Sequence, residues 1–424
     1  MTNCDMQHHR VSDCNRMTPS DPPMPVDEAL CLLLDRAYPV GDIEIVDTYR
    51  ALGRVLASDQ VSTTDAPRFD NSAMDGYAIR SQDTVEHKTT HLHVTQSICA
   101  GSTGQLLPRG CAAQIFTGAP VPMGADTVIM QEECAVDRDQ LLVGRFVRPG
   151  ENIRRRASDI IAGSTVLGKG VKIGPPEMAL AASIGLATLP VYRQLRVAIL
   201  STGNELVSPG SPLKKAQIYS SNRYALVGLL QAIGCQIDDL GITPDELSVT
   251  RNTLLDAANG ADLIITSGGV SVGEEDYVKQ AIADVGQICA WQVAIKPGKP
   301  LAFGSIQETP IIGLPGNPVA LFITFLVFVR PFLKRMQGIT DTAIRAIQVP
   351  AGFERTCPKN RREYVCARLC IDSGGTVTSK LYAKRGSDIL TAMTWAHGLV
   401  EIPERQPIKL GQPVRYLPFT ELMS

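Results

Sequence analysis

The sequence lacks an apolar run long enough to cross a membrane. The longest such run, Val319 to Val329, is short and is interrupted by Thr324, whereas a membrane span needs about 20 residues. We therefore expect no membrane partner, and we predict a helix buried on all sides for this run.

An excess of basic charge is also missing. The 424 residues include 41 Lys and Arg against 43 Asp and Glu, which gives a net charge of −2. Proteins that bind the phosphate backbone of nucleic acids need a basic excess, so nucleic acid is excluded as a partner. Any bound anion must be held locally, by a few side chains and backbone amides. Hydrophobic residues at 44% and charged residues at 20% are typical of a globular protein and exclude a disordered one.

The first 24 residues (Met1 to Met24) lack the apolar core of a secretory signal. We predict a disordered tail there. The eleven cysteines are an odd number and are scattered along the chain, which favours reduced thiols and a cytoplasmic location. Cys4, His8, His9 and Cys14 fit no standard zinc spacing, so a solvated tail is favoured over a metal site.

The middle of the chain alternates strands and helices, which predicts a doubly wound α/β domain with a parallel sheet over residues 194–342. One helix is expected at Ser221 to Ile233, closed by Gly234. Short apolar runs between turns predict a β-rich region at 91–150 and a small C-terminal β domain at 343–424. Helices are expected after Pro25 and after Pro175. The fold class is therefore multidomain α/β plus β.

Three glycine loops each follow an expected strand of the α/β domain, at 201–205, 267–276 and 313–318. Ligands of open α/β sheets lie beyond the carboxyl ends of the strands. Each loop alone is commonly a simple turn. Three at one edge, with Ser and Thr hydroxyls and with Glu205 and Asp276, indicate phosphate binding with a carboxylate-held Mg²⁺.

Two lysines, Lys296 and Lys299, lie in a turn between two strands of the same domain. They can neutralise a phosphate or another oxyanion, although a solvated loop has the same composition. Arg154 to Arg156 precede Asp159 and could hold an anion, although such a run is usually a solvated charge cluster.

Residues 68–78 form a loop with two carboxylates, an amide, a hydroxyl and a glycine, and Asp75 is one of the carboxylates. Such a loop is typical of a binding site. The alternative is a stack of turns made by Asp and Asn side chains.

These segments, in this order, resemble the molybdopterin molybdenumtransferase family, the MoeA-like proteins that include the E domain of gephyrin. The resemblance runs from about Pro25 to the C-terminus, and the ordered combination is highly specific. The matching stretches are Phe69–Arg80, Ile115–Glu132, Asn152–Gly163, Ile199–Leu206, Ile218–Arg223, Ser267–Tyr277, Ala294–Gly304 and Gly313–Pro318.

The resemblance implies an elongated homodimer with four domains per chain. Residues 61–158 are then an inserted β-rich domain, and 25–60 with 159–193 combine into a mixed N-terminal domain that helps dimerisation. The α/β domain would bind molybdopterin. The active cleft would lie between the α/β domain of one subunit and the insert of the other, so the loop carrying Asp75 would face the glycine loops of the second chain.

The implied reaction is insertion of molybdate into the dithiolene of adenylylated molybdopterin, with release of AMP and with Mg²⁺ as the metal. Contact with the upstream molybdopterin adenylyltransferase is also expected. The implied catalytic residues are Asp75, Asp159, Glu205 and Asp276, of which Glu205 and Asp276 hold the metal. The implied substrate-binding residues are Thr117, Ser201, Thr202, Gly203, Ser220, Asn222, Ser267, Gly268, Gly269, Ser271, Gly273, Lys296, Lys299, Pro315, Gly316, Asn317 and Ser387.

The sequence departs from the family pattern at two of these regions. Asn204 stands where relatives often carry Asp, so we expect Glu205 to supply the charge. Cys366 stands about where relatives carry an arginine, and Arg362 or Arg368 would have to replace it.

Two other functions stay open. A non-catalytic scaffold would have no reason to keep the four carboxylates. An adenylyltransferase would carry Thr-Gly-Gly-Thr-Gly where this chain has Ser-Gly-Gly-Val-Ser.

Overall fold

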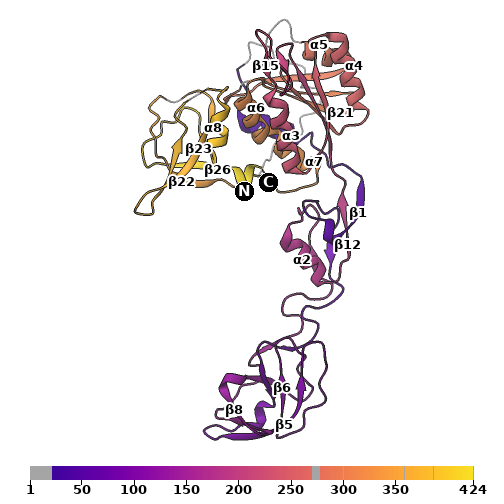
Figure 1. Ribbon diagram of the computed structural model, residues 1–424, viewed down its shortest axis with the longest axis vertical. Helices are drawn as coiled ribbons and strands as arrows, with labels where there is room; N and C mark the ends of the chain where they lie inside the picture. The colour runs from indigo at the N-terminus through magenta and orange to yellow at the C-terminus, as the bar shows by residue number, and fades with distance from the viewer. Residues whose placement is uncertain (1–21, 270–276, 299, 358, 385, 424) are drawn as a thin grey trace. The chain divides into compact units, whose positions relative to one another are not determined.

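The computed structural model describes residues 22–269, 277–298, 300–357, 359–384 and 386–423 (Figure 1). The chain divides into two compact units. Unit 1 takes in Met1–Glu44, Gly53–Ala57 and Val191–Ser424, and unit 2 takes in Ile45–Leu52 and Ser58–Pro190. No helix in the described residues is long and apolar enough to cross a membrane.

A six-stranded sheet with the order β16-β13-β17-β21-β20-β18 forms the centre of unit 1. Its first four strands are parallel, as predicted. β20 runs antiparallel to both of its neighbours, β21 and β18, so the sheet is mixed, which corrects the expectation of a parallel sheet. The short connection explains this direction. Only two residues separate β20 from β21, whereas parallel neighbours need a crossover of a dozen or more residues. The bounds are β13 (Arg196–Thr202), β16 (Gln236–Thr243), β17 (Leu263–Ser267), β18 (Gly286–Gln292), β20 (Pro300–Ile306) and β21 (Thr309–Leu314).

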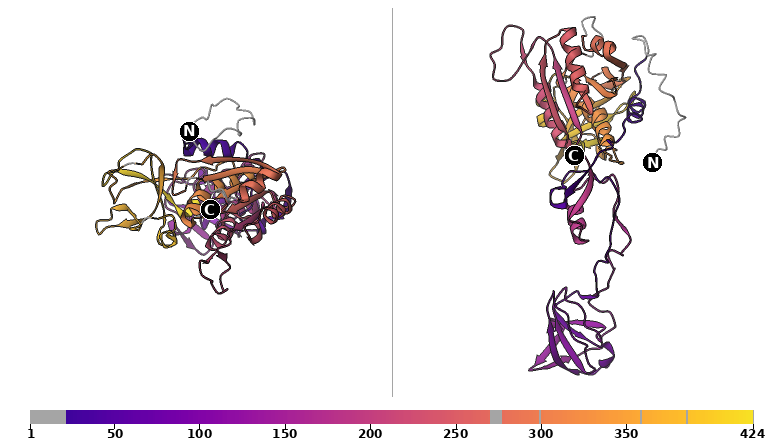
Figure 2. Two further views of the ribbon diagram at one scale, coloured as in Figure 1. Left: turned by 90° about the horizontal axis from the view of Figure 1, so that it is seen from above. Right: turned by 90° about the vertical axis from the view of Figure 1, so that its right-hand side faces the viewer.

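Helices cover both faces of this sheet (Figure 2), and each face has its own apolar core. One core includes residues of α4 (Leu247–Ala258) and α5 (Tyr277–Val285). The larger core includes residues of α3 (Ser221–Ile233), α6 (Pro318–Thr324), a π-helical segment (Phe325–Val329) and α7 (Arg330–Met336). All five residues of the π-helical segment are buried, which confirms the predicted interior helix. Gly234 ends α3 in the left-handed backbone conformation (φ 88°), as expected for a glycine that follows a helix.

The N-terminal helix α1 (Val26–Leu34) also packs on this larger core, through Val26, Ala29 and Leu33. Just before it, Met24 extends the sheet: its N–H donates to Gln292 O at 2.7 Å, and Ala294 N–H donates to Met24 O at 2.8 Å. The sequence placed Met24 in the tail and α1 in the mixed N-terminal domain, whereas both belong to unit 1. The first 21 residues of the predicted tail, with Cys4, His8, His9 and Cys14, lie outside the described residues.

The C-terminal part of unit 1 is a second sheet with the order β19-β23-β25-β26-β22, and β24 pairs with β23. Its first strand, β19, comes from the α/β segment and so joins the two sheets. Two short helices, α8 and α9, accompany the strands that the sequence predicted. The bounds are β19 (Ile295–Lys296), β22 (Ile347–Pro350), β23 (Arg362–Ile371), β24 (Val377–Leu381), α8 (Leu390–Trp395), β25 (Gly398–Ile402), β26 (Pro413–Pro418) and α9 (Phe419–Leu422).

Unit 2 contains the predicted β-rich region as a six-stranded sheet with the order β7-β4-β6-β5-β9-β8. Outside this sheet, β11 pairs with β2. Two more two-stranded ladders pair β3 with β10 and β1 with β12, and a third, β14 with β15, belongs to unit 1. Their bounds are β1 (Ile43–Asp47), β2 (Gln60–Val61), β3 (Asn71–Ser72), β4 (Gly76–Ile79), β5 (Thr90–Ile98), β6 (Cys111–Ile115), β7 (Thr127–Met130), β8 (Cys134–Asp137), β9 (Gln140–Val143), β10 (Ile153–Arg154), β11 (Thr165–Leu167), α2 (Pro175–Ser183), β12 (Thr188–Tyr192), β14 (Leu206–Val207) and β15 (Ile218–Tyr219). The finer division of the sequence into a tail and four domains stays a prediction.

Candidate functional site

The three glycine loops begin where three adjacent parallel strands, β13, β17 and β21, end. They touch one another: Gly268 N–H donates to Leu314 O at 3.1 Å. A Cβ on Gly268 would lie 3.3 Å from Thr202 O, and one on Gly316 would lie 3.9 Å from Gly268 Cα. At Gly268, with a φ of 87°, the nearby Thr202 O leaves little room for a side chain. The predicted meeting of the loops at one sheet edge is therefore present in the structure.

Several buried polar groups at this edge have no hydrogen-bond partner among the described residues. They are the hydroxyls of Ser220 and Thr266 and the side-chain oxygen of Asn222. Ser220 is only 2% exposed and is the N-cap residue of α3, while Asn222 donates from Nδ2 to Gly316 O at 2.7 Å. Unpaired buried polar groups are costly. A phosphate at the N-terminus of this 13-residue helix would accept a hydrogen bond from the Ser220 hydroxyl. It could not serve Asn222 Oδ1, which is itself an acceptor.

The first loop carries the predicted metal carboxylate, Glu205, which is exposed. A Cβ on Gly203 would lie 2.5 Å from Glu205 Oε2, so the carboxylate folds back over a position that needs glycine. Beside it, Asn204 N–H donates to Asp245 Oδ2 at 3.1 Å, and Asp245 N–H donates to Asn204 Oδ1 at 3.3 Å. The sequence interpretation missed Asp245, although its place two residues after β16, at the same sheet edge, could have indicated it.

The oxygens of Glu205, Asn204 and Asp245 are the ligand types that Mg²⁺ prefers. Within the described residues, no three His, Cys, Asp or Glu side chains are grouped as a complete metal site. The second predicted metal ligand, Asp276, lies outside the described residues, as do Ser271, Gly273 and Lys299. The chemistry of the oxygens present fits Mg²⁺, and the full set of ligands stays a prediction.

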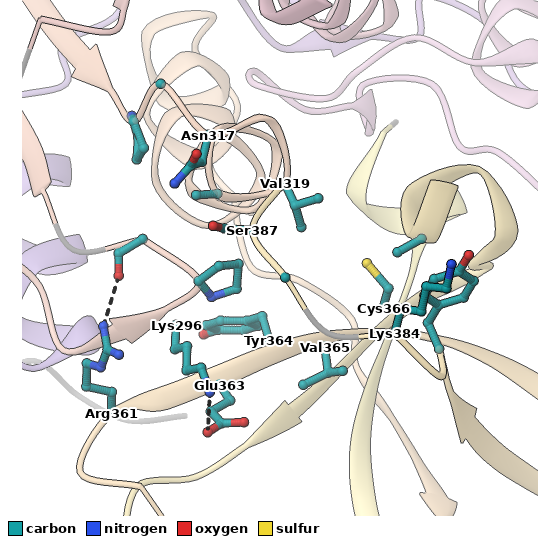
Figure 3. Close-up of a pocket in the computed structure, with 18 of the residues that line it drawn as sticks. Lys296, Asn317, Val319, Arg361, Glu363, Tyr364, Val365, Cys366, Lys384 and Ser387 are labelled. Atoms are coloured by element: carbon teal, nitrogen blue, oxygen red, sulfur yellow. Dashed lines mark hydrogen bonds and ion pairs between the residues drawn. The ribbon is translucent and has the colours of Figure 1, made fainter. Parts of the chain in front are cut away.

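A cavity of about 660 Å³ opens beside the second and third glycine loops (Figure 3). The α/β segment contributes Lys296 and α6, and the C-terminal segment contributes β23 and the loop after β24. Ser387 O accepts from Val319 N–H at 2.9 Å, which holds Ser387 at the first turn of α6. The cavity thus gathers predicted residues from both segments, namely Gly268, Gly269, Lys296, Pro315, Gly316, Asn317 and Ser387.

Position 366 gives this cavity a thiol. Cys366 Sγ donates to Met393 Sδ at 3.2 Å, and burial raises the thiol's pKa to about 11, so the side chain is neutral. Arg362 instead pairs with Asp27 at 2.7 Å, and the Arg368 guanidinium lies 4.5 Å from the ring centre of Trp395.

Neither Arg362 nor Arg368 is among the residues that line the cavity, and the replacement of a family arginine by one of them stays a prediction. Among the described residues, the arginines that line it are Arg355 and Arg361. The sequence interpretation missed both.

In unit 2, the predicted site residues Asp75 and Thr117 contact each other. Asp75 Oδ1 accepts from the Thr117 N–H at 2.7 Å and from its hydroxyl at 2.8 Å. These two bonds lower the pKa of the exposed Asp75 carboxyl, so it carries its charge at neutral pH. Its other oxygen, Oδ2, makes neither of these bonds. Asp159, the second carboxylate predicted in this region, is also exposed.

Two arginines of the run beside Asp159 form ion pairs with aspartates of the same unit. Arg155 Nη1 lies 2.7 Å from Asp70 Oδ2, and Arg156 Nε lies 2.6 Å from Asp65 Oδ2. The backbone N–H of Arg156 also donates to Asp70. These pairs fix the loop and leave Arg154 as the member of the run without an ion pair among those found in the described residues.

Comparison with known proteins identifies the family of this chain. Three family models match: the MoeA N-terminal region (domain I and II) at residues 24–185, the probable molybdopterin binding domain at 198–335, and the MoeA C-terminal region (domain IV) at 348–419. A molybdopterin molybdenumtransferase of Haemophilus influenzae is 36% identical over 409 residues, covering 94% of this chain and 99% of that one. The chain belongs to the molybdopterin molybdenumtransferase family.

Further members of the family agree. Molybdopterin molybdenumtransferase 2 of Mycobacterium tuberculosis is 38% identical over 84% of this chain and 89% of its own. A solved molybdopterin biosynthesis MoeA protein of Pyrococcus horikoshii OT3 superimposes with a TM-score of 0.81, at 30% identity, over 94% of this chain and all of that one. The predicted family and fold class are confirmed, and the chain is an enzyme of a transferase family in molybdenum cofactor biosynthesis.

Proposed function

We propose that this protein inserts molybdate into the dithiolene of adenylylated molybdopterin and releases AMP. The observation that carries the proposal is the carboxyl edge of the α/β sheet. Three glycine loops and the unpartnered Ser220 hydroxyl lie there beside a cavity to which the described residues contribute Lys296, Arg355, Arg361 and Lys384. The substrate has phosphates for the loops, and molybdate is an oxyanion suited to the cavity.

The phosphate groups would bind at the N-terminus of α3. The Ser220 hydroxyl has no partner there among the described residues, and the helix end adds backbone N–H groups and a positive dipole. The hydroxyls of Ser201 and Ser267, 3.2 Å apart, lie at the ends of the two neighbouring strands. The Ser220 hydroxyl can donate to a phosphate oxygen, which would fix the phosphoanhydride in one orientation.

Glu205, with Asp276, would hold Mg²⁺. The ion would neutralise charge on the phosphoanhydride as AMP leaves. Lys296, Lys299 and Ser387 would hold molybdate. In a homodimer, Asp75, Thr117 and Asp159 of the partner subunit would complete the cleft. We expect the reaction to take place in the cytoplasm, on substrate delivered by the adenylyltransferase.

The direct test is to incubate purified protein with adenylylated molybdopterin, molybdate and Mg²⁺ and to follow AMP release. AMP should appear in step with the loss of adenylylated molybdopterin, and omission of molybdate or addition of a chelator should stop it. Absence of AMP with all components present would favour a scaffold of the same fold. Formation of adenylylated molybdopterin from ATP would indicate an adenylyltransferase.

A mixing experiment tests the shared active site. Asp75→Asn and Asp276→Asn should each be inactive alone. After random subunit exchange, half of the dimers carry one of each chain, and one of the two sites in such a dimer is intact. Activity should therefore return to about a quarter of the wild-type value. Heterodimers that form and stay inactive would place the site within one chain.

A further inference from the structure

A buried carboxylate, Glu363, lies in the wall of the cavity that we propose for molybdate. Its side chain is only 4% exposed, which is costly for a carboxylate without partners. The register of β19 and β23 places Lys296 directly opposite Glu363, and Lys296 Nζ lies 3.4 Å from Glu363 Oε1 (Figure 3).

The second partner of Glu363 comes from the loop before β23. Arg355 donates from Nη2 to Glu363 Oε2, and its side chain is 12% exposed. Two backbone hydrogen bonds with Ile408, at 2.8 and 3.0 Å, fix the Arg355 main chain. Its Nε has no hydrogen-bond partner in the described part of the chain. Two cations thus share one carboxylate, and the group of three carries a net charge of +1.

The two other cations of the cavity wall are arranged differently. Arg361 Nη1 faces the backbone oxygens of Ile295 at 3.4 Å and Gly298 at 3.5 Å, so this side chain supports the loop that follows Lys296. Lys384 is exposed and has the freedom of a solvated lysine. Of the four, only Lys296 and Arg355 are held together by a buried counter-charge.

We infer that Arg355 and Lys296, held together by Glu363, bind the tetrahedral oxyanion in this cavity. The inference rests on the proposed function and names the residues that hold its oxyanion. Arg355 and Lys296 both contact Glu363, and without it their charges would repel each other in this wall, where the dielectric constant is low. Glu363 offsets that repulsion before the ligand binds. The planar guanidinium of Arg355 presents several N–H donors to an oxyanion, and Lys296 adds a compact charge. Glu363 is a positioning residue, since it acts through both.

Binding of molybdate alone to the full-length protein, measured by titration calorimetry, tests the inference. Arg355→Met should weaken molybdate binding about 10- to 100-fold, the loss expected for a charge-assisted hydrogen bond. Arg368→Met removes the same charge from a position outside the cavity wall and should change binding by less than about twofold, because solvent screens that charge. Adenylylated molybdopterin should bind all of these variants with unchanged affinity.

A double variant separates binding by Arg355 from simple neutralisation of Glu363. Arg355→Met with Glu363→Gln removes both charges, and its molybdate affinity should stay well below that of the wild type. If the double variant binds molybdate as well as the wild type does, Arg355 only neutralises Glu363 and the inference is overturned. Arg355→Lys, which keeps the charge without the planar donors, should give an intermediate loss and provides the same comparison should Arg355→Met fail to fold.

The two proposals can fail separately. If the wild type releases AMP and Arg355→Met binds molybdate normally, the inference falls and the proposed function stands. If molybdate does not bind to the wild type, the inference is overturned, and AMP release then decides the proposed function by itself.

Discussion

The two ends of the α/β sheet use their polar groups in opposite ways. At the amino end, the Asp262 carboxylate accepts from Arg193 Nη1 and Nη2 and from Arg196 N–H, each at 2.7 Å. At the carboxyl end, the hydroxyl of Ser220, the N-cap residue of α3, is buried without a partner in the described structure. The same sheet therefore has one end completed by the protein and one end left for a ligand to complete. This difference separates residues that stabilise the fold from residues kept for binding.

Asp75 in unit 2 is the strongest challenge to that comparison. One of its oxygens is fully used by Thr117, as at the amino end of the sheet, yet we expect Asp75 to act on the substrate. Asp75→Asn keeps an acceptor for both Thr117 bonds, so the fold should survive. It removes the charge, and activity should fall at least ~100-fold, as for the loss of a key electrostatic group. AMP release measures the effect.

The matched control is Asp137→Asn, an exposed carboxylate on β8 of the same unit, which should leave AMP release unchanged. Near-normal AMP release by Asp75→Asn would show that Asp75 only orders its loop. In that case a carboxylate that has protein hydrogen-bond partners would serve the fold in both units, and not binding.

Glu205 and Asn204 sharpen the comparison at the carboxyl end. Glu205→Gln should reduce activity and Mg²⁺ dependence about 10- to 100-fold, as for the loss of a metal ligand. Asn204→Asp keeps the oxygen that accepts from Asp245 N–H but places a second negative charge next to Asp245. We expect less than about a tenfold change, because added attraction for the cation and repulsion from Asp245 oppose each other.

An Mg²⁺ titration of AMP release distinguishes the two variants. The roles assigned to these neighbours are reversed if Asn204→Asp abolishes activity while Glu205→Gln retains it.

The sequence could predict this carboxyl end because each of its parts is local. A strand, a glycine loop and a helix start follow one another within a few residues, and Gly234 ends α3 as its conformation requires. Parallel strands then bring the separate loops to one edge without further information.

The cation pair of the cavity could not be predicted in this way. Lys296 and Glu363 meet through the register of β19 and β23, which no local pattern encodes. Arg155 and Arg156 were read as a free charge run for the same reason, since Asp70 and Asp65 lie far away in the sequence. The antiparallel edge was missed because strand patterns alone carry no direction.

Asp262 tests the amino end of the sheet. Burial alone would raise the pKa of Asp262, but the hydrogen bonds from Arg193 and Arg196 lower it below 3.8 overall. Because the folded-state pKa is depressed, the stabilisation is present above pH 3.8 and is lost as the pH falls through the folded value. Asp262→Asn should lower the free energy of unfolding by about 1–3 kcal/mol at pH 7 and leave AMP release per folded molecule unchanged.

Urea unfolding at pH 7 and at pH 3 measures this contribution. The difference between Asp262→Asn and the wild type should shrink at the lower pH. A variant that keeps its stability but loses AMP release would reverse the assignment of this end to the fold.

The smallest expected effect lies at the edge of the same sheet, where Met24 pairs with the chain after β18. Deletion of residues 1–21 should leave the melting temperature and AMP release unchanged, because this segment has too little apolar surface to offset an ordering entropy of ~1–2 kcal/mol per residue. Deletion through Met24 should cost about 1–3 kcal/mol, since it removes the two backbone hydrogen bonds with Gln292 and Ala294. Thermal unfolding of both truncations gives the comparison. Equal melting temperatures would show that the sheet does not need Met24, and a drop already on removal of residues 1–21 would show that the segment has a structural role.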